Sequence, residues 1–101
     1  MSKPFTDLMI SIVSEQPGVY FLMDKAGDVI YIGVAKNPGG LRRELRKHYF
    51  RIFPIEIKEA YDFDAEICNN PIERCEEILA EYEAKFGCLP KYNQQTVTEA
   101  G

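Results

Sequence analysis

Two short apolar stretches on either side of a turn constrain the fold of this chain more than any other feature. Val19–Met23 and Val29–Ile32 are apolar and rich in β-formers, and Asp24-Lys25-Ala26-Gly27 lies between them with aspartate first and glycine last. Apolar β-rich runs joined by such a turn are typical of a β-hairpin. The sequence therefore predicts a sheet in which these two strands are antiparallel neighbours.

Three further stretches show the apolar spacing of helices. The first precedes the hairpin, with Thr6 as a candidate N-cap and Pro17-Gly18 as a stop, and its length is about ten residues. Its apolar positions are Phe5, Leu8, Met9, Ile12 and Val13. The second helix follows the break at 37–40, and its apolar positions are Leu41, Leu45 and Tyr49. The third begins at Asn70-Pro71 and ends at Gly87, and its apolar positions are Ile72, Cys75, Ile78, Leu79, Tyr82 and Phe86.

Residues 61–68 alternate between apolar and polar side chains, which predicts a half-buried third strand. Together these elements predict a small single-domain α/β sandwich in which helices flank a three-stranded, mainly antiparallel sheet. The expected element order is α-β-β-α-β-α. Residues 1–93 form the expected domain, and 94–101 form a polar tail that we expect to be frayed.

Composition narrows the class of protein. The chain has 101 residues, of which 46% are hydrophobic, enough for one small core. No apolar run approaches the roughly 18 residues of a membrane span, so we expect a soluble, cytoplasmic protein. Three cysteines without a C-x-x-C pair fit a reducing compartment, and with one histidine their spacing matches no zinc motif.

The net charge of −4 conceals two oppositely charged helices. The basic residues of the second helix and its end are Arg42, Arg43, Arg46, Lys47 and Arg51. The acidic residues of the last helix are Glu73, Glu76, Glu77, Glu81 and Glu83. A local basic surface can bind nucleic acid although the whole chain is acidic, so the charge total limits the affinity without excluding that partner.

Three short motifs resemble those of one enzyme family. Gly18-Val19-Tyr20 begins the first hairpin strand, Tyr31-Ile32-Gly33 ends the second, and Pro90-Lys91-Tyr92-Asn93 follows the last helix. In this order they resemble the signature of the GIY-YIG nuclease superfamily, and they are most similar to the N-terminal nuclease domain of the bacterial excision-repair nucleases. The resemblance covers about residues 4 to 93.

The resemblance implies metal-dependent hydrolysis of DNA phosphodiester bonds, in DNA repair, with one magnesium or manganese ion. It implies that Tyr20 and Tyr31 position or deprotonate the attacking water, which requires both phenols on one face of the sheet. Because these tyrosines are eleven residues apart, a loop of two or four residues centred on Lys25-Ala26 sets them opposite each other. We therefore predict an even-membered hairpin loop.

The family also places an arginine on the second helix to stabilise phosphate charge. Aligning the leucines of that helix puts Glu44 at the arginine position, and Arg43, one residue away, is the candidate replacement. His48 or Tyr49 aligns with a third polar aromatic residue of the family, and the Tyr-Phe pair favours Tyr49. Asn93 is expected to close the site by bonding a backbone group or a tyrosine.

The metal-binding glutamate of the family is harder to assign. The apolar stripe of the last helix puts Cys75 at its position, and a thiol is a poor magnesium ligand. Glu76 is the first candidate for the metal ligand, and Glu81 is the second. Val34 replaces a lysine that follows the second motif in the repair enzymes. The candidate nucleic-acid-binding residues are Lys36, Arg42, Arg43, Arg46 and Lys47.

Two functional hypotheses follow. The first is a small metal-dependent endonuclease that cuts DNA, branched or damaged, with a protein partner that supplies targeting. The second is a catalytically degenerate module of the same fold that binds nucleic acid or protein. The altered arginine, glutamate and lysine positions favour the second hypothesis, because loss of one such group costs orders of magnitude in rate. The retained tyrosines, glycines and asparagine favour the first.

Overall fold

A computed structural model describes residues 2–50 and 57–94 of the chain. Its elements, in chain order, are β1 (Lys3–Pro4), α1 (Asp7–Ser11), β2 (Gly18–Met23), β3 (Val29–Ala35), α2 (Gly40–Tyr49), β4 (Asp62–Ile67) and α3 (Pro71–Phe86). The predicted α/β class and the antiparallel sheet with flanking helices are confirmed. The predicted tail, apart from Gln94, lies outside the described residues. No helix in the described part of the chain is long and apolar enough to cross a membrane.

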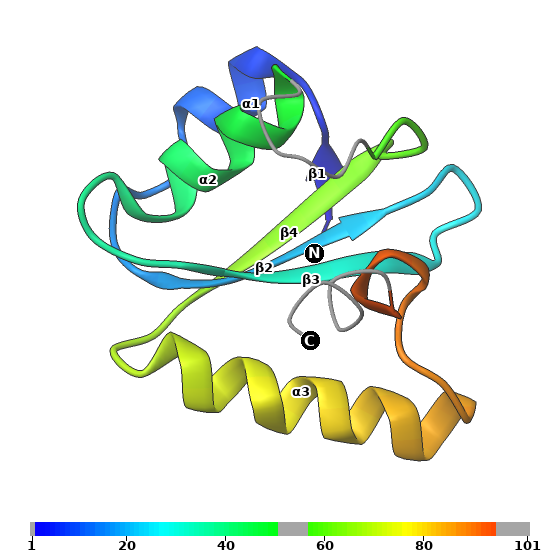
Figure 1. Ribbon diagram of the computed structural model, residues 1–101. Helices are drawn as coiled ribbons and strands as arrows, with labels where there is room; N and C mark the ends of the chain where they lie inside the picture. The colour runs from blue at the N-terminus through cyan, green and yellow to red at the C-terminus, as the bar shows by residue number, and fades with distance from the viewer. Residues whose placement is uncertain (1, 51–56, 95–101) are drawn as a thin grey trace.

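The sheet has four strands in the order β1-β4-β2-β3, and all neighbours are antiparallel. The predicted three-stranded sheet was therefore wrong by one strand. β1 contains only Lys3 and Pro4, which pair with Phe63 and Asp62 of β4, and a two-residue strand is too short to show an alternating pattern. Helices α1 and α2 cover one face of the sheet, and α3 covers the other (Figure 1).

Helix α1 is five residues long, so the predicted length of about ten residues was wrong. Thr6 is its N-cap, as predicted, and its hydroxyl accepts a hydrogen bond of 3.3 Å from the Met9 amide. The apolar spacing overstated the helix because only Ile10 of this segment is fully buried. Leu8 and Ile12 are 75% and 67% exposed, so the apolar spacing of this segment does not mark residues that pack against the sheet.

The hairpin is confirmed, but its loop is not even-membered. Met23 pairs with Val29, which leaves an odd number of residues, 24–28, between the strands. The pairing register then shifts, because Leu22 pairs with Tyr31 and leaves Ile30 as an extra residue on β3. Because of this β-bulge, Tyr20 and Tyr31 lie on the same face of the sheet, which the odd-membered loop alone would prevent.

Two apolar clusters lie on the two faces of the sheet. The larger, on the α1 and α2 face, contains Ile10, Tyr20, Leu22, Ile30, Ala35, Leu41, Leu45, Phe63 and Tyr92. The smaller, on the α3 face, contains Val19, Ile32 and Cys75. At the margin of the sheet beyond β1, the Asp64 carboxylate accepts a hydrogen bond of 2.8 Å from the Ala65 amide of β4.

Candidate functional site

Tyr20 of β2 and Tyr31 of β3 lie on the same face of the sheet, as predicted. They are diagonal rather than opposite, since Tyr20 pairs with Gly33 and Tyr31 pairs with Leu22. The centroids of the two rings are 6.1 Å apart. Tyr20 is buried, and Tyr31 is partly exposed, so the pair extends from the core to the surface.

Gly33 determines where the Tyr20 ring can lie. A Cβ atom at position 33 would collide with the phenol end of Tyr20, including its hydroxyl oxygen. The ring therefore crosses the outer strand β3 at the one residue without a side chain. The glycine of the Tyr31-Ile32-Gly33 motif is thus required by side-chain packing across the strands.

His48 of α2 completes a cluster with the two tyrosines. A hydrogen bond of 2.8 Å joins the Tyr20 hydroxyl to Nε2 of His48, and the His48 ring lies 5.4 Å from the Tyr20 ring and 5.3 Å from the Tyr31 ring. Tyr49, the favoured candidate from the sequence, is 38% exposed and contacts Phe5 and Phe50 instead. The helical period favours His48 over Tyr49, because i+7 from Leu41 lies about 20° around the helix from it and i+8 lies about 80° away.

The electrostatic surroundings keep this cluster neutral. Burial raises the pKa of Tyr20 well above its usual value, and the nearby Tyr31 and Glu44 raise it further. Burial also raises the pKa of Tyr31, with contributions from Cys75 and Glu44. Burial lowers the pKa of His48 to about 4, and Lys47 adds to that effect. The groups of this chain thus oppose the formation of a phenolate.

Glu44 is the charged residue that α2 brings to the tyrosines. Its carboxylate is largely buried and forms an ion pair of 3.4 Å with Lys47. Arg43, the candidate replacement for the family's arginine, is exposed, donates a hydrogen bond of 3.3 Å to the Pro38 carbonyl, and is absent from the groups that shift the pKa of either tyrosine. The charged side chain of α2 that acts on both tyrosines is therefore a carboxylate, that of Glu44.

The other candidate nucleic-acid-binding residues lie on or beside α2. Arg42 donates a hydrogen bond of 2.9 Å to the Val13 carbonyl and pairs with Glu15 at 3.4 Å. Arg46 pairs with Asp7 at 3.8 Å. Lys36 follows β3, is exposed, and lines a hollow of about 260 Å³ together with Val34, Asn37, Pro38, Arg43, Glu44 and Lys47.

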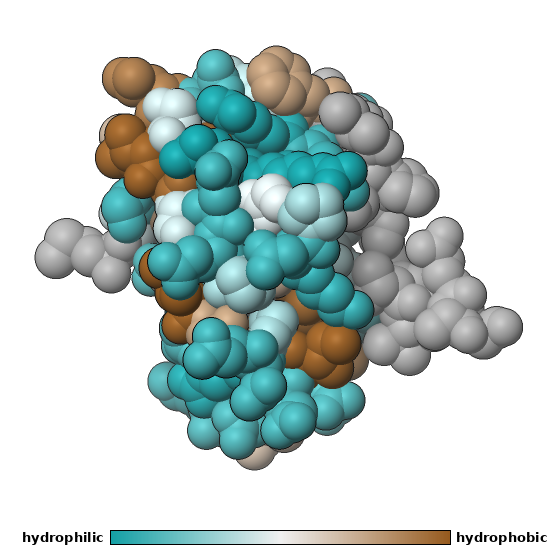
Figure 2. Space-filling model, turned by 90° about the vertical axis from the view of Figure 1, so that its left-hand side faces the viewer, coloured by the Kyte–Doolittle hydropathy of each residue, from teal (hydrophilic) through white to brown (hydrophobic). Residues whose placement is uncertain are grey.

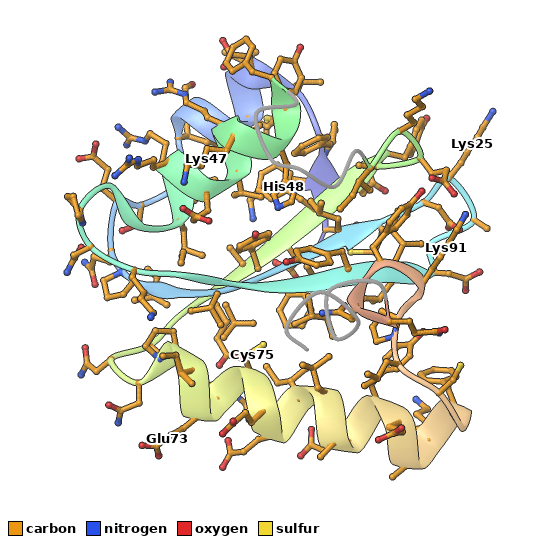
Figure 3. The ribbon with its side chains drawn as sticks, in the orientation of Figure 1. Lys25, Lys47, His48, Glu73, Cys75 and Lys91 are labelled. Carbon is orange, nitrogen blue, oxygen red and sulfur yellow. The ribbon has the colours of Figure 1, made fainter. Side chains whose placement is uncertain are left out.

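Cys75 is the side chain of α3 that is buried against the sheet, on the face opposite to the one that carries Tyr20 and Tyr31. It points from α3 towards the sheet, opposite His48 and Lys47 on α2 (Figure 3), and packs against Val19 and Ile32. Its thiol contributes to the raised pKa of both tyrosines, whereas Glu76 and Glu81 contribute to neither. Both glutamates are exposed. The apolar stripe predicted for α3 thus agrees with the burial of Cys75, whereas its place at the family's metal position stays a prediction.

Asn93 joins the end of the described chain to β3. Its side-chain carbonyl accepts a hydrogen bond of 2.8 Å from the Ile32 amide, and its side-chain amide donates one of 2.9 Å to the Ile32 carbonyl. The partner is a backbone group, one of the two alternatives expected from the sequence. Pro90 and Tyr92 of the same motif are also buried, so the motif is a docking segment next to Tyr31 and Gly33.

The residues around the tyrosines do not fit a magnesium or manganese ion. Both ions prefer oxygen ligands, and the α3 side chain that is buried against the sheet is a thiol whose pKa is raised by burial and by Glu76. Within residues 2–50 and 57–94, no three histidine, cysteine, aspartate or glutamate side chains are grouped so that they could hold a metal ion. A site built on one carboxylate of α3 would need Glu76 or Glu81, and both are exposed.

Comparisons with known proteins agree on one relationship. The chain is 32% identical over 93 residues to UvrABC system protein C of Chlamydia trachomatis serovar D, covering 86% of this chain and 14% of that protein. It is 40% identical over 52 residues to the protein of the same name from Flavobacterium johnsoniae, covering 52% of this chain and 8% of that protein. The chain therefore spans less than a sixth of the length of these relatives. No family model matches the chain.

Solved structures show the same relationship. The GIY-YIG N-terminal endonuclease domain of UvrC from Thermotoga maritima, bound to its catalytic magnesium ion, superposes with a TM-score of 0.54 at 27% identity, covering 84% of this chain and 91% of that domain. A point mutant of that domain with an asparagine changed to alanine, also bound to its catalytic divalent cation, superposes with a TM-score of 0.55 at 27% identity, covering 84% of this chain and 90% of that one.

Proposed function

Since the chain belongs to the GIY-YIG nuclease superfamily and has the fold of the UvrC N-terminal endonuclease domain, we propose that it binds nucleic acid without cutting it. In this proposal the chain keeps the scaffold of the nuclease domain and has lost the groups that hydrolyse the phosphodiester bond. DNA is the proposed ligand, and a protein partner supplies the targeting, as expected for a domain that the relatives carry within a much longer chain.

The observation that carries the proposal is the thiol of Cys75, the α3 side chain that is buried against the sheet at the position which the family resemblance gives to the metal-binding glutamate. The Thermotoga domain binds a catalytic magnesium ion, and a hard divalent ion needs carboxylate or other oxygen ligands. Neither Glu76 nor Glu81 acts on the tyrosines, and both are exposed. Substitution of a metal-binding carboxylate by a neutral thiol removes both the ligand and its charge.

Glu44 gives a second, independent reason. A phosphate approaching Tyr20 and Tyr31 would meet a largely buried carboxylate, which raises the pKa of both phenols. Removal of a single group that stabilises transition-state charge costs about 10²–10³ in rate, and here a negative group replaces it. The retained tyrosines, Gly33 and Asn93 have structural roles in this chain, so their presence supports the endonuclease hypothesis only weakly.

The loss of cleavage is tested by restoring the two groups. Plasmid DNA is incubated with manganese and either the wild-type chain or the double variant Cys75→Glu, Glu44→Arg, and nicked product is measured. Binding of manganese alone is followed by calorimetry. We expect no nicking and no stoichiometric manganese binding by the wild type, and manganese binding by the double variant. Cys88→Glu is the matched control, because Cys88 is exposed and beyond the end of α3.

Cleavage by the wild-type chain would contradict the proposal. Manganese-dependent nicking that Tyr31→Phe abolishes would establish the endonuclease hypothesis instead. The tyrosine variant is needed because nicking by a contaminating nuclease would persist when Tyr31 is changed.

Binding itself is tested with fluorescently labelled DNA over a series of salt concentrations. The affinity should fall as salt rises, because each phosphate contact releases bound counterions. Charge reversal of Arg43 and Arg46 to glutamate should abolish the binding. Lys85→Glu is the control, since Lys85 is exposed on α3 on the other side of the sheet. If the wild type does not bind at low salt, a surface for docking a protein becomes the better explanation of α2.

A further inference from the structure

The outer side of α2 forms a hollow of about 560 Å³ that contains cations and one aromatic ring. Its lining residues are Glu15, Gly39, Arg42, Arg43, Arg46, Lys47 and Phe50. Figure 2 looks onto this side of the molecule, where hydrophilic residues cover the surface of α2 and apolar residues gather at the upper left, over α1. The hollow lies apart from Tyr20 and Tyr31 of the sheet, which contact His48 on the inner side of the same helix.

Phe50 is exposed but is held by a row of aromatic rings. Phe63 in the core lies 6.2 Å from Phe5, Phe5 lies 5.6 Å from Tyr49, and Tyr49 lies 5.1 Å from Phe50. Phe63 is fully buried, whereas Phe50 is 58% exposed. Because successive edge-to-face contacts fix the rings, Phe50 presents a face to solvent with little freedom to lose on binding.

The four cations of the hollow are accessible although three of them have carboxylate partners. Arg42, Arg46 and Lys47 each form one ion pair, at 3.4, 3.8 and 3.4 Å. The Arg42–Glu15 and Arg46–Asp7 pairs lie at the surface, where such a pair contributes roughly 0–1 kcal/mol, so an incoming phosphate can displace or join them at small cost. Arg43 lines the hollow and forms no ion pair in the part of the chain that the structure describes. Phosphate is the group that this set of side chains fits.

We propose that this hollow binds single-stranded polynucleotide, with one base stacked on Phe50 and the adjacent phosphates on Arg43 and its basic neighbours. This inference rests on the proposed function and names its substrate class. An exposed aromatic ring beside cations is the arrangement that sequence-independent single-strand binding uses, because every base has a π-face. In a duplex the bases stack on one another, so Phe50 would have no face to contact.

Charge distribution gives a second reason to prefer a single strand. The duplex presents a dense line of phosphates over a long surface, and the chain with a net charge of −4 has one basic helix to meet it. A flexible strand can follow α2 alone and avoid the acidic helix α3. The stacking contact then adds affinity that does not depend on further positive charge.

The absence of tryptophan from the chain permits a direct test. Phe50→Trp places a single fluorescent indole in the hollow, and a base stacked on that indole quenches its emission. Phe86→Trp is the matched control: Phe86 is 57% exposed, contacts Tyr82 at 4.5 Å and has Lys85 over its ring, but lies on α3. We expect oligothymidylate to quench the emission of the Phe50→Trp variant and to leave that of the Phe86→Trp variant unchanged.

Affinities come from fluorescence anisotropy of labelled oligothymidylate, oligouridylate and a blunt hairpin duplex of the same charge. Phe50→Ala, checked for folding by circular dichroism, should weaken binding of both single strands about 5- to 150-fold, because stacking of one base is worth about 1–3 kcal/mol. The duplex affinity should be lower than that of either strand and should not change. Phe86→Ala should change none of these values.

The outcomes separate the two proposals. If no polynucleotide binds to the wild type at low salt, the proposed function fails and this inference fails with it. If oligothymidylate binds but neither quenches the Phe50→Trp variant nor responds to Phe50→Ala, the proposed function stands and the single-strand hollow is refuted. Equal or tighter binding of the duplex would also refute it.

Discussion

His48 should make the stability of this chain depend on pH, and it can be studied without interference because the chain has no other histidine. Burial lowers the pKa of its imidazole to about 4 in the folded chain, from an ordinary value of 6.5. Below the ordinary value the unfolded chain binds a proton that the folded chain does not bind. The free energy of unfolding therefore decreases as the pH falls from about 6.5 towards about 4, and is constant above that window.

The size of the effect follows from the same two pKa values. Between about pH 7.5 and about pH 5, the linkage relation gives a loss of about 2 kcal/mol in the free energy of unfolding. That is a large part of the stability of a domain of this size. The pH window lies above the range in which most carboxylates titrate, so the loss is assigned to the imidazole. The pKa of His48 is low because its imidazole is buried beside Tyr20 and Tyr31. Exposure of the ring to solvent would break its hydrogen bond with Tyr20.

Urea denaturation at closely spaced pH values measures this loss. The His48→Gln variant keeps a group that can bond the Tyr20 hydroxyl and does not titrate, so its free energy of unfolding should be flat over the same window. The single imidazole resonance in a proton NMR titration should give the low pKa directly. A flat profile for the wild type, or the same slope in the wild type and the variant, would refute the argument.

Three other predictions concern packing and docking. Gly33→Ala should destabilise the fold by about 1–3 kcal/mol because its Cβ meets the Tyr20 ring, and urea denaturation should show that most of this cost disappears in a Tyr20→Leu background. Gly27→Ala, at a positive φ of 92° in open space, should cost about 1–2 kcal/mol in either background, so that a background-dependent cost there would argue against the packing explanation. Asn93→Ala should lower stability by about 1–3 kcal/mol and speed hydrogen exchange of the Ile32 amide, whereas unchanged exchange at Ile32 would contradict the docking role of Asn93.

The sequence was sufficient to predict the hairpin, two of the helices and the sharing of a face by Tyr20 and Tyr31. The predicted reason for the shared face, an even-membered loop, was wrong. The loop has an odd number of residues, and the β-bulge at Ile30 brings the two tyrosines back to one face. A bulge depends on how two strands pack, and no residue type marks its position. The strand at Lys3 and Pro4 was missed for a different reason, since it is held only by pairing with β4.

The candidate site was predicted in part. The motif residues Tyr20 and Tyr31 contact each other, and Asn93 bonds Ile32 beside Tyr31, whereas the place of Glu44 at the family's arginine position stays a prediction. The helical period favours His48, which bonds Tyr20, but the Tyr49-Phe50 pair had favoured Tyr49. Which side chain of α3 faces the sheet depends on the rotation of the whole helix, and only packing fixes that rotation.

The two hydrogen bonds between Asn93 and Ile32 also affect how molecules of this chain meet one another. β3 is an outer strand, and free backbone groups on an outer strand recruit strands from other molecules. The Asn93 side chain offers one donor and one acceptor, as the backbone of a foreign strand would. Its two hydrogen bonds therefore occupy both the amide and the carbonyl of Ile32. At the opposite margin the carboxylate of Asp64 holds the Ala65 amide. At each margin a side chain that also completes the fold thus occupies a backbone site to which a foreign strand would otherwise bind.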